Sequence, residues 1–327
     1  MNHTERLKQA LRGERVTPPL RALWRHFPVD DQDPQCLAEA TLLWQRTFDW
    51  DLVKVTPASS FCLKDWGAQD SWRGNPEGTR EYTHFVIRHP QDWERLPLLS
   101  PVEKEAPHLY AQRLTLRLVR QALGEDVPIL QTVFSPLAQA KNLAGAERLL
   151  VHLRRFPQAV LKGLETITRT TRRFIEACLE EGSIDGVFYA VQHAQAALLS
   201  EEEYHRFGRP YDLQILEAAR PLWCNMLHLH GQEIYAELFY DYPVQILNWH
   251  DRETAPSLKE AAKRFPGLLC GGVSRSRLVY GTPSEVREEA QEALAQVGGE
   301  RLMLSTGCVV PIIAPWGNLL SLARFSS

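Results

Sequence analysis

The feature that most constrains the fold is a succession of short apolar runs, rich in β-branched residues, that alternate with helical stretches along the 327-residue chain. Strands that alternate with helices are joined by right-handed crossovers and form a parallel sheet. Eight such runs predict an α/β fold of the closed (β/α)₈ TIM-barrel type, and an open doubly wound sheet is the alternative. The expected strands are 20–24, 52–56, 128–134, 184–190, 224–228, 244–249, 267–273 and 302–305.

One segment interrupts this alternation. We expect a single domain over residues 1–327, with a long insertion at 57–126 between the second and third strands. The insertion is rich in Trp, Gly and charge and contains a candidate strand at 82–88. Long excursions on barrels are typical of functional lids or subunit contacts, so a homodimer is one expected assembly.

Composition narrows the class of protein. Net charge is −3, from 37 basic and 40 acidic side chains, and this balance lacks the basic excess that phosphate neutralisation requires. We therefore expect no nucleic-acid partner. There is no apolar stretch near 18 residues and no signal-peptide pattern, and the six cysteines are widely spaced. These features predict a cytoplasmic enzyme with free thiols and a small-molecule substrate, with no membrane association.

The sharpest candidate site is a pair of histidines near the end of the fifth expected strand. Strand alternation sends His228 and His230 to the same face, towards the mouth of a barrel, where catalysis occurs in this fold. Cys308, after the last expected strand, adds a thiolate, so the three side chains predict a zinc site with one open position. The alternative is that both histidines bond structural partners while Cys308 packs as a small apolar group.

Other polar residues fall near the ends of the expected strands. His250 and Asp251 are candidates for acid/base or orienting roles, with His250 also a candidate fourth metal ligand; the alternative is a loop-capping Asp beside a solvated His. His193 is either a catalytic or substrate-contacting residue or a buried structural one. The candidate substrate-binding residues are Arg21, Arg25, Gln131 and Tyr189, where the arginines either bind a carboxylate or form ordinary salt bridges.

Lys54 stands inside the apolar run Leu52-Val53-Lys54-Val55. A lysine that faces a barrel interior needs a partner. We favour a structural ion pair over a functional role for this side chain.

Several motifs together resemble the uroporphyrinogen decarboxylase superfamily, a (β/α)₈ fold that also contains zinc-dependent corrinoid methyltransferases related to methylcobamide:coenzyme M methyltransferase. The resemblance covers nearly the whole chain. It is carried by Arg6-Leu7-Lys8-Gln9-Ala10-Leu11-Arg12-Gly13-Glu14, Gly182-Ser183-Ile184-Asp185-Gly186-Val187, Gly281-Thr282-Pro283-Ser284-Glu285-Val286 and Ser305-Thr306-Gly307-Cys308-Val309-Val310-Pro311.

The chain departs from the haem-pathway decarboxylases. Their Arg-Gln-Ala-Gly-Arg-Tyr motif is replaced by Ala22-Leu23-Trp24-Arg25-His26-Phe27, and Thr56-Pro57-Ala58-Ser59 stands where their catalytic Asp follows the second strand. The methyltransferase branch uses a His-x-Cys pair and a distant Cys around zinc. His228 and Cys308 match the first and last of these, and His230 replaces the middle Cys.

The resemblance therefore implies zinc-dependent methyl or alkyl transfer to a thiol-type acceptor, with a corrinoid as methyl donor and a corrinoid protein as partner. One alternative is metal-free decarboxylation of a porphyrinogen-like tetrapyrrole polycarboxylate, held by Arg21, Arg25 and histidines. Another is a tetrapyrrole- or corrinoid-binding protein without catalytic activity.

Overall fold

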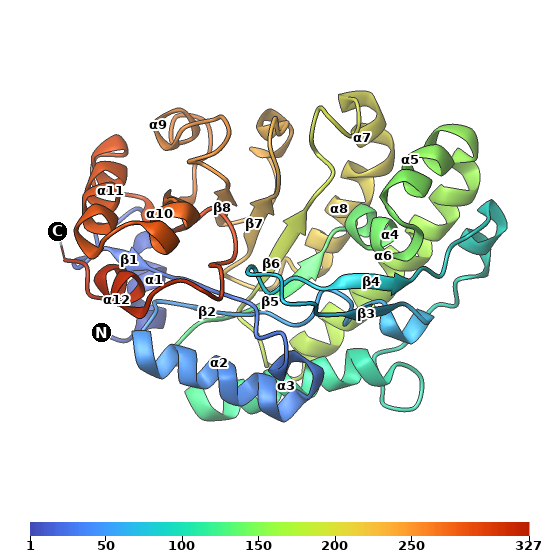
Figure 1. Ribbon diagram of the computed structural model, residues 1–327, viewed down its shortest axis with the longest axis horizontal. Helices are drawn as coiled ribbons and strands as arrows, with labels where there is room; N and C mark the ends of the chain where they lie inside the picture. Colours follow the sequence, from blue (N-terminus) through green and yellow to red (C-terminus); the bar gives the residue numbers. More distant parts are fainter. Residues whose placement is uncertain (327) are drawn as a thin grey trace.

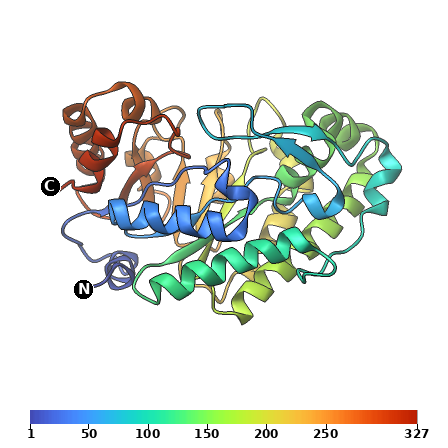
Figure 2. The same ribbon diagram turned by 60° about the horizontal axis from the view of Figure 1, so that its bottom comes forward.

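Eight parallel strands form one curled sheet with helices around it in the computed structural model, which describes residues 1–326 (Figure 1, Figure 2). The strand order is β1-β10-β9-β8-β7-β6-β5-β2, so the first strand lies beside the last. The expected (β/α)₈ barrel is confirmed. The strands are β1 (Leu20–Arg21), β2 (Val53–Val55), β5 (Ile129–Phe134), β6 (Gly186–Val191), β7 (Met226–Leu229), β8 (Ile246–Trp249), β9 (Leu268–Val273) and β10 (Leu302–Thr306).

The helices pack on the outside of the strands because their apolar faces bury the outward-facing strand side chains. They are α1 (His3–Leu11), α2 (Pro34–Phe48), α3 (Pro107–Leu123), α4 (Pro136–Ala144), α5 (Ala146–Arg155), α6 (Pro157–Glu180), α7 (Glu201–Phe207), α8 (Arg209–Ala218), α9 (Leu258–Ala261), α10 (Arg275–Tyr280), α11 (Pro283–Gln296) and α12 (Trp316–Ala323). None of the helices within residues 1–326 has the length and apolar character needed to cross a membrane.

Capping residues in the sequence mark several of these helix starts, and α7 and α11 are two examples. Thr282 caps α11 and Ser200 caps α7, and each forms a capping box with the Glu three residues later. Each box satisfies backbone N–H groups that a helix start leaves unpaired. The run Thr282-Pro283-Ser284-Glu285 carries the signals of a helix start: a capping Thr, Pro at the first helical position and Glu to complete the box.

The barrel closes differently between β1 and β2 than elsewhere. No ladder joins these two strands within residues 1–326. Instead, the N–H of Asp51 donates to the carbonyl of Arg21 over 2.9 Å. The buried Asp51 carboxylate accepts from the N–H of Arg21 at 2.8 Å and from Nε of Arg6, on α1, at 2.7 Å. Side chains from the N-terminal helix therefore complete the closure.

The expected insertion, residues 57–126, consists of two parts. Its first part holds short 3₁₀ helices and the antiparallel hairpin β3 (Gln69–Ser71) and β4 (Glu81–His84), which is drawn in cyan in Figure 1. Its second part is α3, which packs against α2 as a barrel helix does (Figure 2). The strand expected at 82–88 is therefore a shorter hairpin strand outside the barrel.

Candidate metal centre and cavity

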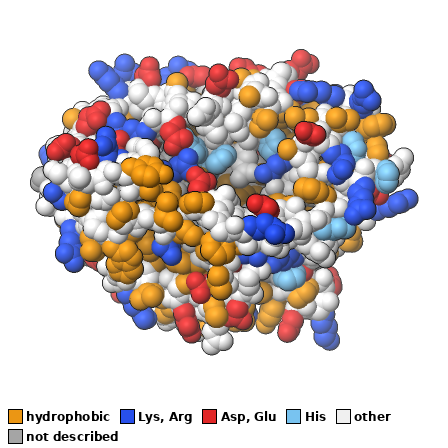
Figure 3. Space-filling view, viewed as in Figure 1, with side chains coloured by type: hydrophobic (Ala, Val, Ile, Leu, Met, Phe, Trp, Pro, Cys, Tyr) orange, Lys and Arg blue, Asp and Glu red, His pale blue; other side chains and the backbone are white. Residues whose placement is uncertain are grey.

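A cavity of about 430 Å³ lies at the C-terminal ends of the strands. Figure 3 shows the molecule hollowed near the middle of one face, with His side chains beside the hollow. The walls combine strand ends with the first part of the insertion and with α4. The residues that line it include Trp24, His26, Lys54, Thr56, Glu77, Arg80, Tyr82, Thr132, Phe134, Lys141, Asn142, Phe188, Gln192, His193, His228, His230 and Cys308.

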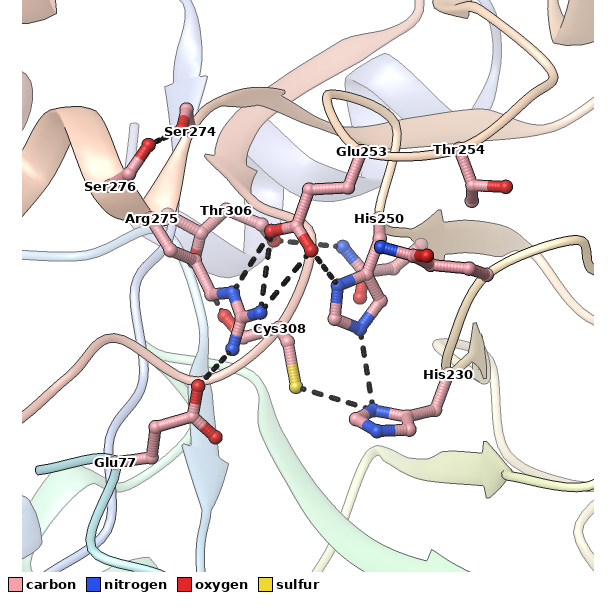
Figure 4. A network of polar contacts seen from close by, with 12 residues as sticks. Glu77, His230, His250, Glu253, Thr254, Ser274, Arg275, Ser276, Thr306 and Cys308 are labelled. Atoms are coloured by element: carbon pink, nitrogen blue, oxygen red, sulfur yellow. Dashed lines mark hydrogen bonds and ion pairs between the residues drawn. The ribbon is translucent and has the colours of Figure 1, made fainter. Parts of the chain in front are cut away.

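Four donor side chains meet beside this cavity. One ligand atom from each of His228, His230, His250 and Cys308 lies within 4.8 Å of each of the others. Nδ1 of His230 is 3.3 Å from Nε2 of His250 and 3.8 Å from Sγ of Cys308 (Figure 4). The structure thus brings together the three residues predicted as zinc ligands and His250, the candidate fourth ligand.

Asn248 orients the ring of His228. Its amide nitrogen donates to the carbonyls of Cys270 at 2.8 Å and Thr306 at 3.0 Å, so its Oδ1 must face His228. That oxygen lies 2.7 Å from Nδ1 of His228 and accepts its proton. A metal-binding histidine usually donates its second ring N–H in this way, which leaves the other nitrogen free for the metal. Nε2 of His228 is therefore the available donor.

A carboxylate orients His250 in the same sense. Nδ1 of His250 lies 3.3 Å from Oε2 of Glu253 and donates to it, so Nε2 is the free nitrogen. His230 presents its Nδ1 to the cluster. Three imidazole nitrogens and one sulfur thus point to one region.

Two glycines allow the chain to place these side chains. Gly231, directly after His230, has φ +105°, and a Cβ there would lie 2.1 Å from the side chain of Gln195. Gly307, directly before Cys308, has its Cβ position 2.6 Å from the Cα of His250. Since only glycine tolerates such approaches, Gly231 lets the turn after His230 pack against Gln195, and Gly307 lets Cys308 lie against the turn that carries His250.

The electrostatics of the cluster favour a thiolate. Burial alone would raise the pKa of Cys308, but the imidazoles of His228, His230 and His250 lower it well below the ordinary value. Burial lowers the pKa of His228. For His250, burial acts against protonation, but Cys308 raises the pKa. A thiolate among imidazoles is the chemical form in which these groups bind a metal ion.

The donor set fits zinc. Zn²⁺ prefers tetrahedral arrangements of His nitrogen and Cys sulfur, and this cluster offers three nitrogens and one sulfur from three neighbouring regions of the barrel mouth. Because Nδ1 of His228 faces Asn248 and Nδ1 of His250 faces Glu253, Nε2 is the nitrogen of each ring that can coordinate a metal ion. No exposed cluster of acids is involved, so the softer metal is favoured over Mg²⁺ or Ca²⁺.

The two arginines predicted to bind substrate lie away from the cavity. Arg21 donates from its guanidinium to the carbonyl of Phe325 at 3.0 Å, on the outside of the barrel. The guanidinium of Arg25 lies over the rings of Phe27 and Trp44, at 5.2 and 5.4 Å from their centroids. Both arginines therefore hold surface elements together, and neither reaches a ligand in the cavity.

Gln131 and Tyr189 also face away, because each has the outward phase of its strand. Oε1 of Gln131 accepts from the amide of Gln112, on α3, at 2.7 Å. The hydroxyl of Tyr189 donates to the buried carboxylate of Asp212, on α8, at 2.5 Å. Their inward-facing neighbours, such as Phe188, line the cavity instead.

Of the two remaining candidates, Asp251 lies outside the cavity and His193 lines it. Asp251 accepts from the N–H of Gly272 at 3.0 Å and braces the turn after β8, outside the cavity; burial raises its pKa to about 7. His193 does line the cavity, and burial, followed by Lys141 and His230, lowers its pKa to about 3. It is therefore a neutral imidazole in the cavity wall at neutral pH.

The interpretation of Lys54 as half of an ion pair is wrong. Its ammonium nitrogen lies 3.2 Å from Oγ1 of Thr56 and 4.5 Å from the ring centroid of Phe188, and no carboxylate in residues 1–326 pairs with it. Burial lowers its pKa to about 7. An apolar strand interrupted by one lysine could have indicated this inward placement.

Two further parts of the cavity wall were not predicted from the sequence. Lys141, on α4, reaches the cavity, and burial lowers its pKa without a compensating carboxylate in the described chain. The insertion contributes the segment Glu77–Arg80. Neither follows from strand ends, which were the only positions that the barrel rule marks.

Comparison with known proteins places this geometry in context. The family model described as uroporphyrinogen decarboxylase (URO-D) matches residues 4–325. Comparison with curated protein sequences gave no match.

Among solved structures, the chain is similar to a methyltransferase from Methanosarcina mazei, with 20% identity, a TM-score of 0.84, and coverage of 99% of this chain and 98% of that one. It is also similar to a B12-independent methionine synthase from Shewanella sp. W3-18-1 in complex with selenomethionine, with 13% identity and a TM-score of 0.60, covering 94% of this chain and 92% of that one. At these identities the likeness is one of fold.

Proposed function

The chain belongs to the uroporphyrinogen decarboxylase family, and from that premise we propose that it is a zinc-dependent enzyme that transfers a methyl or alkyl group to a small thiol. The observation that carries the proposal is the convergence of His228, His230, His250 and Cys308 at the wall of a cavity. The structural neighbours named as a methyltransferase and a methionine synthase support the same reaction class.

In this proposal, the role of the metal site is to activate the thiol group of the acceptor. With four protein donors already present, the acceptor thiol would bind Zn²⁺ as an additional ligand, and Zn²⁺ would lower the pKa of that thiol and hold it as a thiolate at neutral pH. Asn248 and Glu253 keep the rings of His228 and His250 aimed at the site before the acceptor arrives. An imidazole ligand from His230, where the methyltransferases that the chain resembles have a Cys thiolate, would leave the site more positive by one charge. This favours loss of the thiol proton and makes the resulting thiolate less nucleophilic.

The cavity selects a small acceptor. A volume of about 430 Å³ lies in the lower part of the range for pockets that enclose small molecules. Trp24 and Phe188 form apolar walls that exclude water, and Lys54, Lys141 and His193 supply polar contacts. The two lysines without carboxylate partners favour an acceptor that carries an anionic group.

The proposed donor is a corrinoid carried by a partner protein. A ligand of that size exceeds what the cavity can enclose, so its methyl group would be presented at the mouth, close to the four metal-binding side chains. We place the acceptor inside the cavity and the donor outside it.

The test begins with metal content. We expect purified protein to contain about one Zn²⁺ per chain, and His228→Ala and Cys308→Ser to lose it. With methylcobalamin as donor and a panel of small thiols with and without an acidic group, the wild type should demethylate the corrinoid and the two variants should not.

Protein that binds no zinc, or whose transfer activity is unaffected by both substitutions, would overturn the proposal. Chelator-insensitive decarboxylation of a tetrapyrrole polycarboxylate would support the decarboxylase alternative instead. Tight pigment binding without turnover would support the non-catalytic one.

A further inference from the structure

A chain of charged side chains connects the insertion to the metal-binding cluster (Figure 4). Arg275, the first residue of α10, places its guanidinium between two carboxylates. NH1 lies 2.6 Å from Oε1 of Glu77, in the insertion, and Nε lies 3.3 Å from Oε1 of Glu253, after β8. The other carboxylate oxygen of Glu253 accepts from Nδ1 of His250 at 3.3 Å. The contacts run without a gap from Glu77 to His250.

The insertion end of this chain is held in place. The N–H of Ile312 donates to the carbonyl of Pro76 at 2.7 Å. Gly78 has φ +77°, and a Cβ there would lie 2.5 Å from Cβ of His26. The backbone on both sides of Glu77 is thus packed against the barrel mouth, so its carboxylate has a defined position opposite Arg275.

His250 differs from His228 in what orients it. The partner of His228 is Asn248, a fully buried amide locked by two carbonyls. The partner of His250 is Glu253, whose side chain is 35% exposed and is held by Arg275. Without Arg275, Glu253 would be free to turn to solvent, and His250 would lose the acceptor that fixes its ring.

We propose that Glu77 and Arg275 are positioning residues that act through Glu253 to hold His250 as the fourth metal ligand. The insertion between β2 and β5 then contributes to metal affinity although none of its residues is a donor. This inference rests on the proposed zinc site.

The experiment measures Zn²⁺ affinity by competition with a chromophoric chelator. Glu77→Gln and Arg275→Met should each weaken Zn²⁺ binding by about tenfold, the lower end of the usual effect of losing a residue that orients a ligand. Arg277→Met is the matched control, since Arg277 lies on the same helix and pairs with Glu285 instead. Its affinity should equal that of the wild type. Glu77→Gln keeps the size of a partly exposed side chain, so folding is preserved even where Arg275→Met is unstable.

A double-mutant cycle with His250→Ala separates positioning from a general effect of charge. In the His250→Ala background, Glu77→Gln should weaken Zn²⁺ binding no further, because the ligand through which it acts is gone. The visible spectrum of Co²⁺-substituted Glu77→Gln should shift towards that of Co²⁺-substituted His250→Ala.

The outcomes separate the two hypotheses. A wild type that binds no Zn²⁺ would overturn the proposed function and this inference together. A wild type that binds Zn²⁺, with Glu77→Gln of unchanged affinity or with additive effects in the cycle, would overturn the inference alone.

Discussion

Replacing Lys54 by Met should stabilise the protein, and the gain should depend on pH. Burial lowers the pKa of Lys54 from 10.5 to about 7. Below pH 7 the folded protein holds a charged ammonium in a buried position, and between pH 7 and 10.5 it has released a proton that the unfolded chain still keeps. Lys54 therefore lowers the free energy of unfolding of the wild type, fully below pH 7 and not at all as the pH approaches 10.5. At 1.36 kcal/mol per pH unit, that decrease is about 5 kcal/mol at most and about 2 kcal/mol at pH 9.

Urea unfolding at pH 6, 7.5 and 9 measures this directly. Lys54→Met should raise the free energy of unfolding by roughly 4–5 kcal/mol at pH 6, and by less at each higher pH. Lys162→Met is the control, because Lys162 is exposed and pairs with Glu94, and it should show no such pH dependence. A gain from Lys54→Met that is equal at pH 6 and pH 9, or a loss at pH 6, would refute the reasoning. Because Lys54 also lines the cavity, Lys54→Met should slow the proposed methyl transfer as well.

Three further predictions test other parts of the molecule. Asn248→Leu removes the acceptor that orients His228 and should weaken Zn²⁺ binding by about 10- to 100-fold in a chelator competition, whereas Asn318→Leu, a buried Asn far from the cluster, should not. Asp212→Ala leaves three buried tyrosine hydroxyls without their acceptor and should lower the free energy of unfolding by about 3 kcal/mol or more in urea, with Zn²⁺ affinity unchanged. In metal-free protein, iodoacetamide should alkylate Cys308 faster than exposed Cys36 at pH 7, because the pKa of Cys308 is lowered while the Asp33 side chain raises the pKa of Cys36. Bound Zn²⁺ should block the alkylation of Cys308. Peptide mass spectrometry that shows Cys36 modified first would contradict this prediction.

The sequence predicts the barrel well because each strand is an apolar run bounded by turn residues. It predicts His228, His230 and Cys308 as neighbours for a related reason: strand ends of a barrel converge, so residues 80 positions apart reach one rim. These arguments need only the order and polarity of the segments.

The phase of each strand is harder to predict. Strands of a (β/α)₈ barrel are buried on both faces, inward against the core and outward against helices, so alternation of polarity is lost. For this reason the sequence does not show that Gln131 and Tyr189 face outward, where their polar atoms bond Gln112 on α3 and Asp212 on α8. Lys54 differs, since a lysine within an apolar run already indicates an inward side chain; what the sequence could not show is that no carboxylate within residues 1–326 pairs with it.

The junction between β1 and β2 is the one place in the barrel where side-chain hydrogen bonds, centred on Asp51, replace a ladder between neighbouring strands of residues 1–326. The strands β7 and β8, which lead into three of the four donors, stand opposite this junction in the strand order. The three histidines therefore lie on the part of the sheet that has continuous strand pairing, away from the one junction that depends on the Asp51 side chain.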